Sequence, residues 1–138
     1  ASAYEAYYER ALQIRHRLSR DFATAFRQCG GVHVLLTPTT PTPPFPIASP
    51  PPTATEMYAN DAMTVPVNLA GLPALSLPVT KARINVAGTP IAVPIGMQLI
   101  APPNTEETLL RIARTLETAA GFSAPEHIFD LGSRGSRG

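Results

Sequence analysis

Residues 56–79 read EMYANDAMTVPVNLAGLPALSLPV, and the interpretation of the whole chain starts from this stretch. It contains a single aspartate, Asp61, in a nearly neutral environment. Its apolar run is interrupted by residues that break or bend regular structure, namely Pro66, Asn68, Gly71, Pro73 and Pro78. Asp61 therefore has three readings, which are a helix cap, a solvated surface charge or a carboxylate that binds a ligand.

A helix is predicted to lead into this stretch. Thr53 and Glu56 have the spacing of a capping box, so the helix should begin near Ala54. Residues at four-residue steps are then predicted to share one face: Met57, Asp61, Val65 and Leu69. Pro66 must kink this helix or split it in two, because proline cannot continue the backbone hydrogen-bond ladder.

Two strands are predicted after the helix, over residues 74–79 and 94–101. The intervening segment, 81–92, is predicted to be a loop or a loose hairpin. Gly96, inside the second strand, would allow another backbone or a ligand to approach closely. On the N-terminal side, residues 32–37 are a short β-branched run typical of a buried strand.

Proline dominates the connection that follows this first strand. Eight of the sixteen prolines of the chain fall within residues 38–52. Proline fixes φ and removes a backbone donor, so the segment is predicted to be an extended, polyproline-like crossing. A ligand for a proline-binding module is the less favoured alternative.

Amphipathic helices are predicted near both ends of the chain. Residues 4–26 repeat apolar side chains at three- and four-residue steps, and a glycine pair ends the helix. Residues 104–121 form the second, with Asn104 and Glu107 as an N-cap pattern, Arg111 paired with Glu107, and Gly121 at the C-terminal cap. The alternation of helices and strands predicts an α/β layer structure, but three short strands need covering helices on both faces. The chain is therefore predicted to be incomplete as an independent domain.

Composition excludes several functional classes. The net charge is +1 and only 15% of residues are charged, which argues against a nucleic-acid or membrane-surface protein. Cys29 is the single cysteine, which favours a reducing compartment. The sequence opens at Ala1 without a methionine, which favours a processed N-terminus or a portion of a longer chain.

Side-chain chemistry gives no sign of a self-sufficient catalyst. No serine lies in a Gly-x-Ser-x-Gly elbow, no phosphate-binding glycine loop is present, and Lys81 is expected to be an exposed loop charge. Cys29 is expected to be a structural thiol. The three histidines lack metal-ligand spacing and are expected to be satisfied or solvent-facing: His16, His33 and His127.

Four segments together carry a resemblance to a known family. MYANDAMTVPVNLAGLPALSLPV (57–79) and PIGMQLIAPPNTEETLLRIARTLE (94–117) closely resemble the C-terminal part of the amidase signature family. Residues 2–22 resemble its long helix, and residues 33–47 resemble its strand and proline crossing. Within the family the chain looks most like the glutamine-hydrolysing A-type subunit of tRNA amidotransferases. The match covers residues 1–131 and leaves 132–138 as a flexible tail, while the loop at 80–92 is longer than usual.

This resemblance implies a fold and an activity. The fold would be the C-terminal part of the amidase-signature fold, a mixed β-sheet covered by helices. The activity would be glutamine hydrolysis by a Ser–Ser–Lys triad, with ammonia passed to a partner subunit that uses ATP and Mg²⁺ to transamidate Glu-tRNA(Gln). No position here matches the triad, so this chain is expected to hold no catalytic residue, no metal and no cofactor, and to be inactive alone.

The resemblance also implies partners and a site. The partners would be the remainder of the amidase domain, B- and C-type subunits and glutamine. Glu-tRNA(Gln) would bind through the partner subunit, and no membrane contact is expected. Asp61 matches the residue that holds the substrate glutamine, where a carboxylate would oppose the α-ammonium. Asn68 and Gln98 are expected to be satisfied buried amides, with orientation of the pocket as the alternative.

Two other functions remain open at this point. One is an amidase for another small amide, and the other is a non-catalytic binding protein on the amidase scaffold. The compartment would be the cytoplasm in a bacterium, or the mitochondrion or plastid in a eukaryote.

Overall fold

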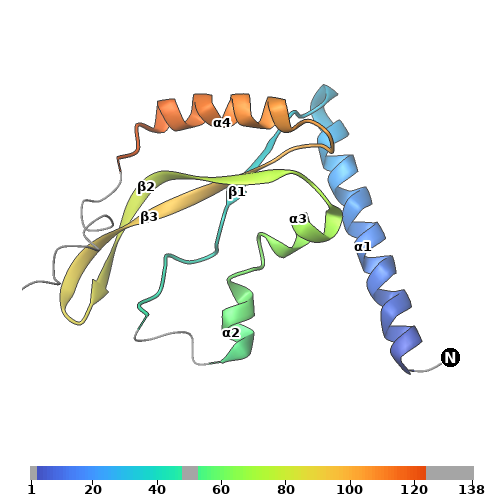
Figure 1. The fold of residues 1–138 in the computed structure, drawn as a ribbon, viewed down its shortest axis with the longest axis horizontal. Helices are drawn as coiled ribbons and strands as arrows, with labels where there is room; N and C mark the ends of the chain where they lie inside the picture. The colour runs from blue at the N-terminus through green and yellow to red at the C-terminus, as the bar shows by residue number, and fades with distance from the viewer. Residues whose placement is uncertain (1–2, 48–52, 124–138) are drawn as a thin grey trace, which may run out of the picture.

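The computed structural model describes residues 3–47 and 53–123, in which a three-stranded sheet is surrounded by helices. The strands lie in the order β1-β3-β2, and both pairings are antiparallel. Figure 1 shows α4 on one side of the sheet, with α2 and α3 on the other. In chain order the elements are α1 (Ala3–Arg27), the short 3-10 helix η1 (Gln28–Gly30), β1 (Leu35–Pro38), α2 (Ala54–Ala59), α3 (Val65–Ala70), β2 (Ala74–Val86), β3 (Thr89–Ile100) and α4 (Glu106–Ala120).

Both faces of the sheet carry a small apolar core. Successive residues of a strand point to opposite faces, so Leu99 and Ile100 belong to different cores. Ile100 packs with Phe26 of α1 and Val67 of α3. Leu99 packs on the other face with Leu109 of α4. The helices thus cover the sheet from two sides, which confirms the α/β layer structure.

The predicted helix around Pro66 is split in two. Helix α2 ends at Ala59 and α3 begins at Val65, with Pro66 in its first turn, where the missing N–H would have had no helical partner. The shared face predicted for residues 57–69 is therefore wrong, because no single helix connects them. The start of α2 is as predicted, since the Glu56 backbone N–H donates to Thr53 Oγ1 at 3.2 Å.

The segment predicted as a loop or loose hairpin is a regular β-hairpin. Strands β2 and β3 are 13 and 12 residues long, not short, and they run through almost all of residues 81–92. Ala87 and Gly88 join them with φ values of 50° and 84°, the left-handed pair that suits a two-residue hairpin turn. Lys81 consequently lies in a strand instead of a loop, and its Nζ is 5.7 Å from the centre of the Phe122 ring.

The two long helices agree with the sequence to within a few residues. Helix α1 matches its predicted range, and so does the C-terminal end of α4, where Gly121 is left-handed with φ 56°. The start of α4 differs, because Thr105 occupies the N-cap while Asn104 is itself left-handed with φ 61°. Arg111 Nη2 donates to Glu107 Oε1 at 2.7 Å, as the spacing predicted.

One predicted strand is shorter than expected, and two predicted segments lie outside the described residues. Strand β1 covers Leu35–Pro38, shorter and later than the predicted 32–37. The C-terminal end of the proline crossing (48–52) and the predicted tail (132–138) lie outside the described residues. Among the helices that the structure describes, none is both long and apolar enough to cross a bilayer.

Candidate functional site

A row of polar side chains crosses the sheet next to the core around Ile100. In the strand register, Thr37 of β1 and Ser76 of β2 both lie opposite Gln98 of β3. These residues are two positions from Ile100 and its neighbours, so they share its face of the sheet. This face of the sheet is therefore apolar under α1 and α3 and polar toward the hairpin turn. Gly96 is the next residue of β3 on the same face.

Two hydroxyl groups meet over Gly96. Thr39 Oγ1 and Ser76 Oγ are 2.6 Å apart, although the strands that lead to them are separated by β3. A Cβ atom at Gly96 would lie 2.8 Å from Ser76 Oγ and 3.0 Å from Thr39 Oγ1. The close approach predicted for Gly96 is confirmed, and the approaching groups are these two hydroxyls.

Gln98 is buried, and its amide nitrogen is hydrogen-bonded twice. It is 5% exposed, and its Nε2 donates to Thr37 Oγ1 at 3.3 Å and to the Met63 carbonyl at 3.1 Å. Asn68 differs from its prediction, because it is exposed on α3 and donates to the Thr64 carbonyl one turn earlier at 3.1 Å. The amide prediction thus holds for Gln98 and is wrong for Asn68.

Asp61 lies in the turn between α2 and α3, which we call the 60–64 turn. Its backbone is firmly bonded: the N–H donates to the Tyr58 carbonyl at 3.0 Å, and the carbonyl accepts from the Val65 N–H at 2.9 Å. The residue is exposed, and across residues 3–47 and 53–123 its carboxylate has no hydrogen bond or ion pair. A helix-cap role is therefore excluded within the described chain, while a surface charge and a ligand contact both remain.

Two further hydrogen bonds hold the 60–64 turn, one from the segment after β1 and one from β3. Thr42 Oγ1 donates to Asn60 Oδ1 at 3.0 Å, and Gln98 donates to the Met63 carbonyl as described above. Asp61 lies between these two anchored residues. The arrangement presents a negative charge from a fixed backbone beside a polar sheet face, which suits recognition of a cationic group.

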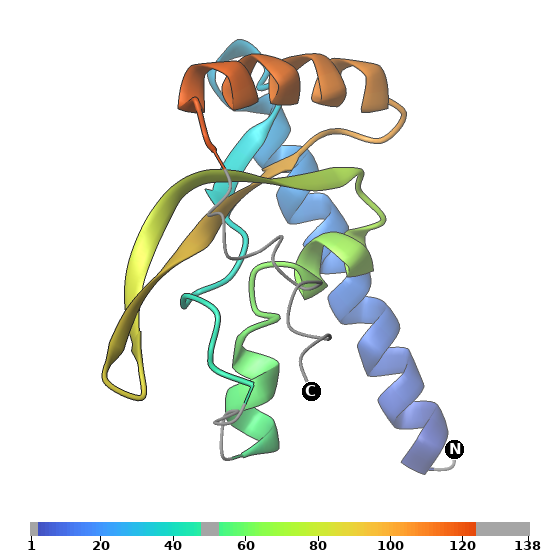
Figure 2. The same cartoon turned by 60° about the vertical axis from the view of Figure 1, so that its left-hand side comes forward.

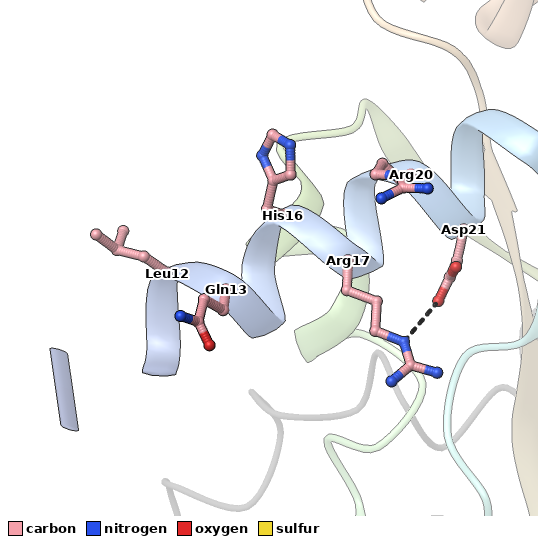
Figure 3. A pocket seen from close by; sticks show the side chains of 6 residues that line it. All are labelled: Leu12, Gln13, His16, Arg17, Arg20 and Asp21. Carbon is pink, nitrogen blue, oxygen red and sulfur yellow. Dashed lines mark ion pairs between the residues drawn. The ribbon is translucent and has the colours of Figure 1, made fainter. Parts of the chain in front are cut away.

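A hollow on α1 does not form a competing site. Figure 3 shows its lining side chains, which all belong to this one helix: Leu12, Gln13, His16, Arg17, Arg20 and Asp21. Arg17 Nε is 4.0 Å from Asp21 Oδ2, and both side chains are largely exposed. Among the described residues this hollow is lined by α1 alone, so these groups do not converge on a ligand.

The described residues contain no set of three histidine, cysteine or acidic side chains that could hold a metal ion. His127 lies outside these residues, and the role expected for Cys29 stays a prediction. The candidate site is therefore the 60–64 turn with the polar row beside it.

The family model for amidases matches residues 1–110. The chain belongs to the amidase family. Over about 90% of its length the chain is also similar to bacterial proteins that are named as the A-type subunit of glutamyl-tRNA(Gln) amidotransferase. The identity is 46% with the protein of Parvibaculum lavamentivorans over 91% of this chain, 42% with that of Zymomonas mobilis over 90%, and 47% with that of Methylorubrum extorquens over 88%. The chain spans only 23–24% of the length of these relatives.

Sequence reasoning singled out Asp61 and Gln98 but missed the hydroxyl groups. Thr39 and Ser76 are 37 positions apart, and only the strand register brings them together. One signal was available, because a glycine within a predicted strand indicates that another group lies close above it. Thr42 lies in the proline crossing and carried no signal of its own.

Proposed function

We propose that this amidase belongs to a glutamine-hydrolysing amidotransferase subunit that supplies ammonia for the transamidation of Glu-tRNA(Gln). The observation that carries the proposal is 42–47% identity, over about nine-tenths of the chain, to proteins whose name states this complex. The partners are then the remainder of the amidase domain, B- and C-type subunits, and Glu-tRNA(Gln) bound through the partner. A cytoplasmic location in a bacterium fits this role.

Asp61 would bind the α-ammonium group of glutamine. Its carboxylate is unengaged by the described residues, and its backbone is bonded on both sides. A charge-assisted hydrogen bond from an ammonium group is stronger than one between neutral groups. It would also separate glutamine from an amide of the same length without an amino group, because that amide leaves the carboxylate unpaired.

The chemical step belongs to parts of the protein outside this chain. Hydrolysis of an amide by acyl transfer needs an activated nucleophile and an oxyanion hole. We assign neither to this chain, nor ATP or Mg²⁺, which we expect at the partner subunit that activates Glu-tRNA(Gln). This chain would contribute one wall of the glutamine site.

The test compares two substrates in the complete amidotransferase carrying Asp61→Asn. The substrates are glutamine and glutaramate, which is glutamine without its α-amino group. Loss of one partner from a buried charge pair costs roughly 2–4 kcal/mol, so kcat/KM for glutamine should fall about thirtyfold to about 700-fold. Hydrolysis of glutaramate should change little, because that substrate makes no use of the carboxylate.

Asp21→Asn on α1 is the control, since it removes another exposed carboxylate outside the 60–64 turn. This variant should leave kcat/KM unchanged for both glutamine and glutaramate. Equal losses for glutamine and glutaramate with Asp61→Asn would return Asp61 to a surface charge. Hydrolysis of small amides with no glutamine preference would indicate a different amidase, and absence of any hydrolysis would indicate a binding protein.

A further inference from the structure

The position of the 60–64 turn does not follow from the helices on either side of it. Helices α2 and α3 are six residues each, too short to be stable without tertiary contacts. Helix α3 buries Val67 against the sheet, but α2 buries no residue. Packing therefore fixes the C-terminal side of the turn and leaves the N-terminal side, where Asn60 and Asp61 lie, dependent on polar contacts.

Two side chains supply those contacts, one from the segment after β1 and one from β3. Thr42, four residues beyond β1, donates to Asn60 Oδ1 at 3.0 Å. Asn60 also donates from Nδ2 to the Glu56 carbonyl at 3.3 Å, which ties the same side chain to α2. Gln98, buried in β3, donates to the Met63 carbonyl at 3.1 Å. The hydrogen bonds thus hold the residues one before and two after Asp61.

We propose that Thr42 and Gln98 are positioning residues that hold the Asp61 carboxylate in the orientation required to receive the α-ammonium of glutamine. The inference rests on the proposed function and extends it to residues that do not contact the substrate. A carboxylate on a turn held at both ends loses less conformational freedom when it binds, which increases affinity without a new contact. Release of one tether should therefore weaken binding of the ammonium group and leave the chemical step intact.

Thr42 gives the cleaner test because it is exposed, whereas Gln98 is buried and its replacement perturbs packing. Thr42→Val keeps the shape of the side chain and removes the donor. A net hydrogen bond contributes about 0.5–1.5 kcal/mol, so KM for glutamine should rise about two- to twelvefold with kcat preserved. Thr42→Ser retains a hydroxyl and should restore much of the affinity.

The control is Thr118→Val in α4, where the lost hydroxyl donates to the Arg114 carbonyl at 2.9 Å away from the 60–64 turn. Kinetics for glutamine and glutaramate, with melting temperatures, are measured for each variant of the complete amidotransferase. Glutaramate kinetics should be the same in Thr42→Val and wild type. In an Asp61→Asn background, Thr42→Val should have no further effect on glutamine, because residues that act through one another are not additive.

Three results overturn this inference. They are equal changes for both substrates, full additivity with Asp61→Asn, and no change in KM for glutamine in either Thr42→Val or Gln98→Met. If Asp61→Asn is selective for glutamine while Thr42→Val and Gln98→Met are silent, the positioning role fails and the proposed function stands. If wild-type enzyme does not prefer glutamine, the proposed function fails and the positioning role fails with it.

Discussion

The absence of a side chain at Gly96 allows other groups to pack against the middle strand of the sheet, β3. The space that a side chain would take is occupied by the hydroxyls of Thr39 and Ser76, which bond to each other at 2.6 Å. The Thr39 N–H also donates to the Gly96 carbonyl at 3.1 Å, so this contact extends the pairing of β1 beyond its last strand residue. The glycine thereby helps to set the course of the chain toward Thr42 and the 60–64 turn.

Gly96→Ala should therefore lower stability through a steric contact instead of backbone strain. The new Cβ would come within 2.8 Å of Ser76 Oγ, and the hydroxyl pair would have to separate. A lost hydrogen bond and a small displacement together suggest a decrease of about 1–2 kcal/mol in the free energy of unfolding of the complete protein. Chemical denaturation of the variant and wild type measures this decrease.

The double variant with Ser76→Ala supplies the control for Gly96→Ala. Ser76→Ala removes the closest atom, so Gly96→Ala should cost less in that background than in wild type. Strict additivity of the two changes would show that the contact over Gly96 does not limit stability.

At the scale of elements, α2 is the segment with the least support. It is six residues long, it has no buried residue, and its N-terminus depends on Thr53, which accepts from the Glu56 N–H and donates to Glu56 Oε2 at 2.8 Å. Loss of an N-cap hydroxyl typically costs about 1 kcal/mol, which is a large part of the stability of so short a helix.

Thr53→Ala should therefore speed amide hydrogen exchange within α2, about fivefold for a loss of 1 kcal/mol. Exchange in α4, which buries Leu109 and Ala113, should not change. Thr53→Ser keeps the cap and should exchange as wild type does. Mass spectrometry on the complete protein resolves both segments, and faster exchange in Thr53→Ser as well would rule out the hydroxyl as the cause.

The elements that the sequence predicts best are those with local causes. The periodicity of α1, the left-handed glycine after α4 and the split at Pro66 all depend on residues within a few positions. The hairpin was predicted only as a loose alternative to a loop, because prolines interrupt both of its strands and its turn uses Ala87 where asparagine is the common signal. The prolines of the hairpin are tolerated because each lies where one side of its strand has no neighbouring strand, so the missing N–H leaves no acceptor unpaired there. Pro78 lies in the edge strand β2, and Pro90 and Pro94 lie beyond the residues of β3 that pair with β1.

The candidate site likewise contains one residue that the sequence singled out and contacts that it did not predict. Asp61 was recognisable as a lone carboxylate in a segment with a family resemblance, but its tethers were not. Thr42 and Asn60 are 18 positions apart, and Gln98 and Met63 are 35 apart. Contacts at this separation depend on strand order and register, which one sequence does not determine.

At the scale of the whole molecule, the described residues leave large apolar side chains uncovered. Figures 1 and 2 show the N-terminal half of α1 extending away from the sheet. Large apolar side chains on that half are 46–78% exposed: Tyr4, Tyr7, Tyr8, Leu12 and Ile14. The relatives named above are much longer than this chain, and we expect the parts they have in addition to cover this surface.

The 138-residue chain on its own should therefore associate and bind an apolar fluorescent dye, and it should not hydrolyse glutamine. Replacing Tyr7 and Tyr8 by serine should reduce dye binding and association, because these residues are 78% and 56% exposed and belong to neither core. Replacing the buried Leu109 by alanine should have the opposite effect, since a cavity in the core typically costs about 2–5 kcal/mol and exposes more apolar surface. Sedimentation, dye fluorescence and thermal unfolding of the three proteins distinguish these outcomes. A monomer with a sharp thermal transition and no dye binding would show that the surface of α1 is stable in water without a covering partner.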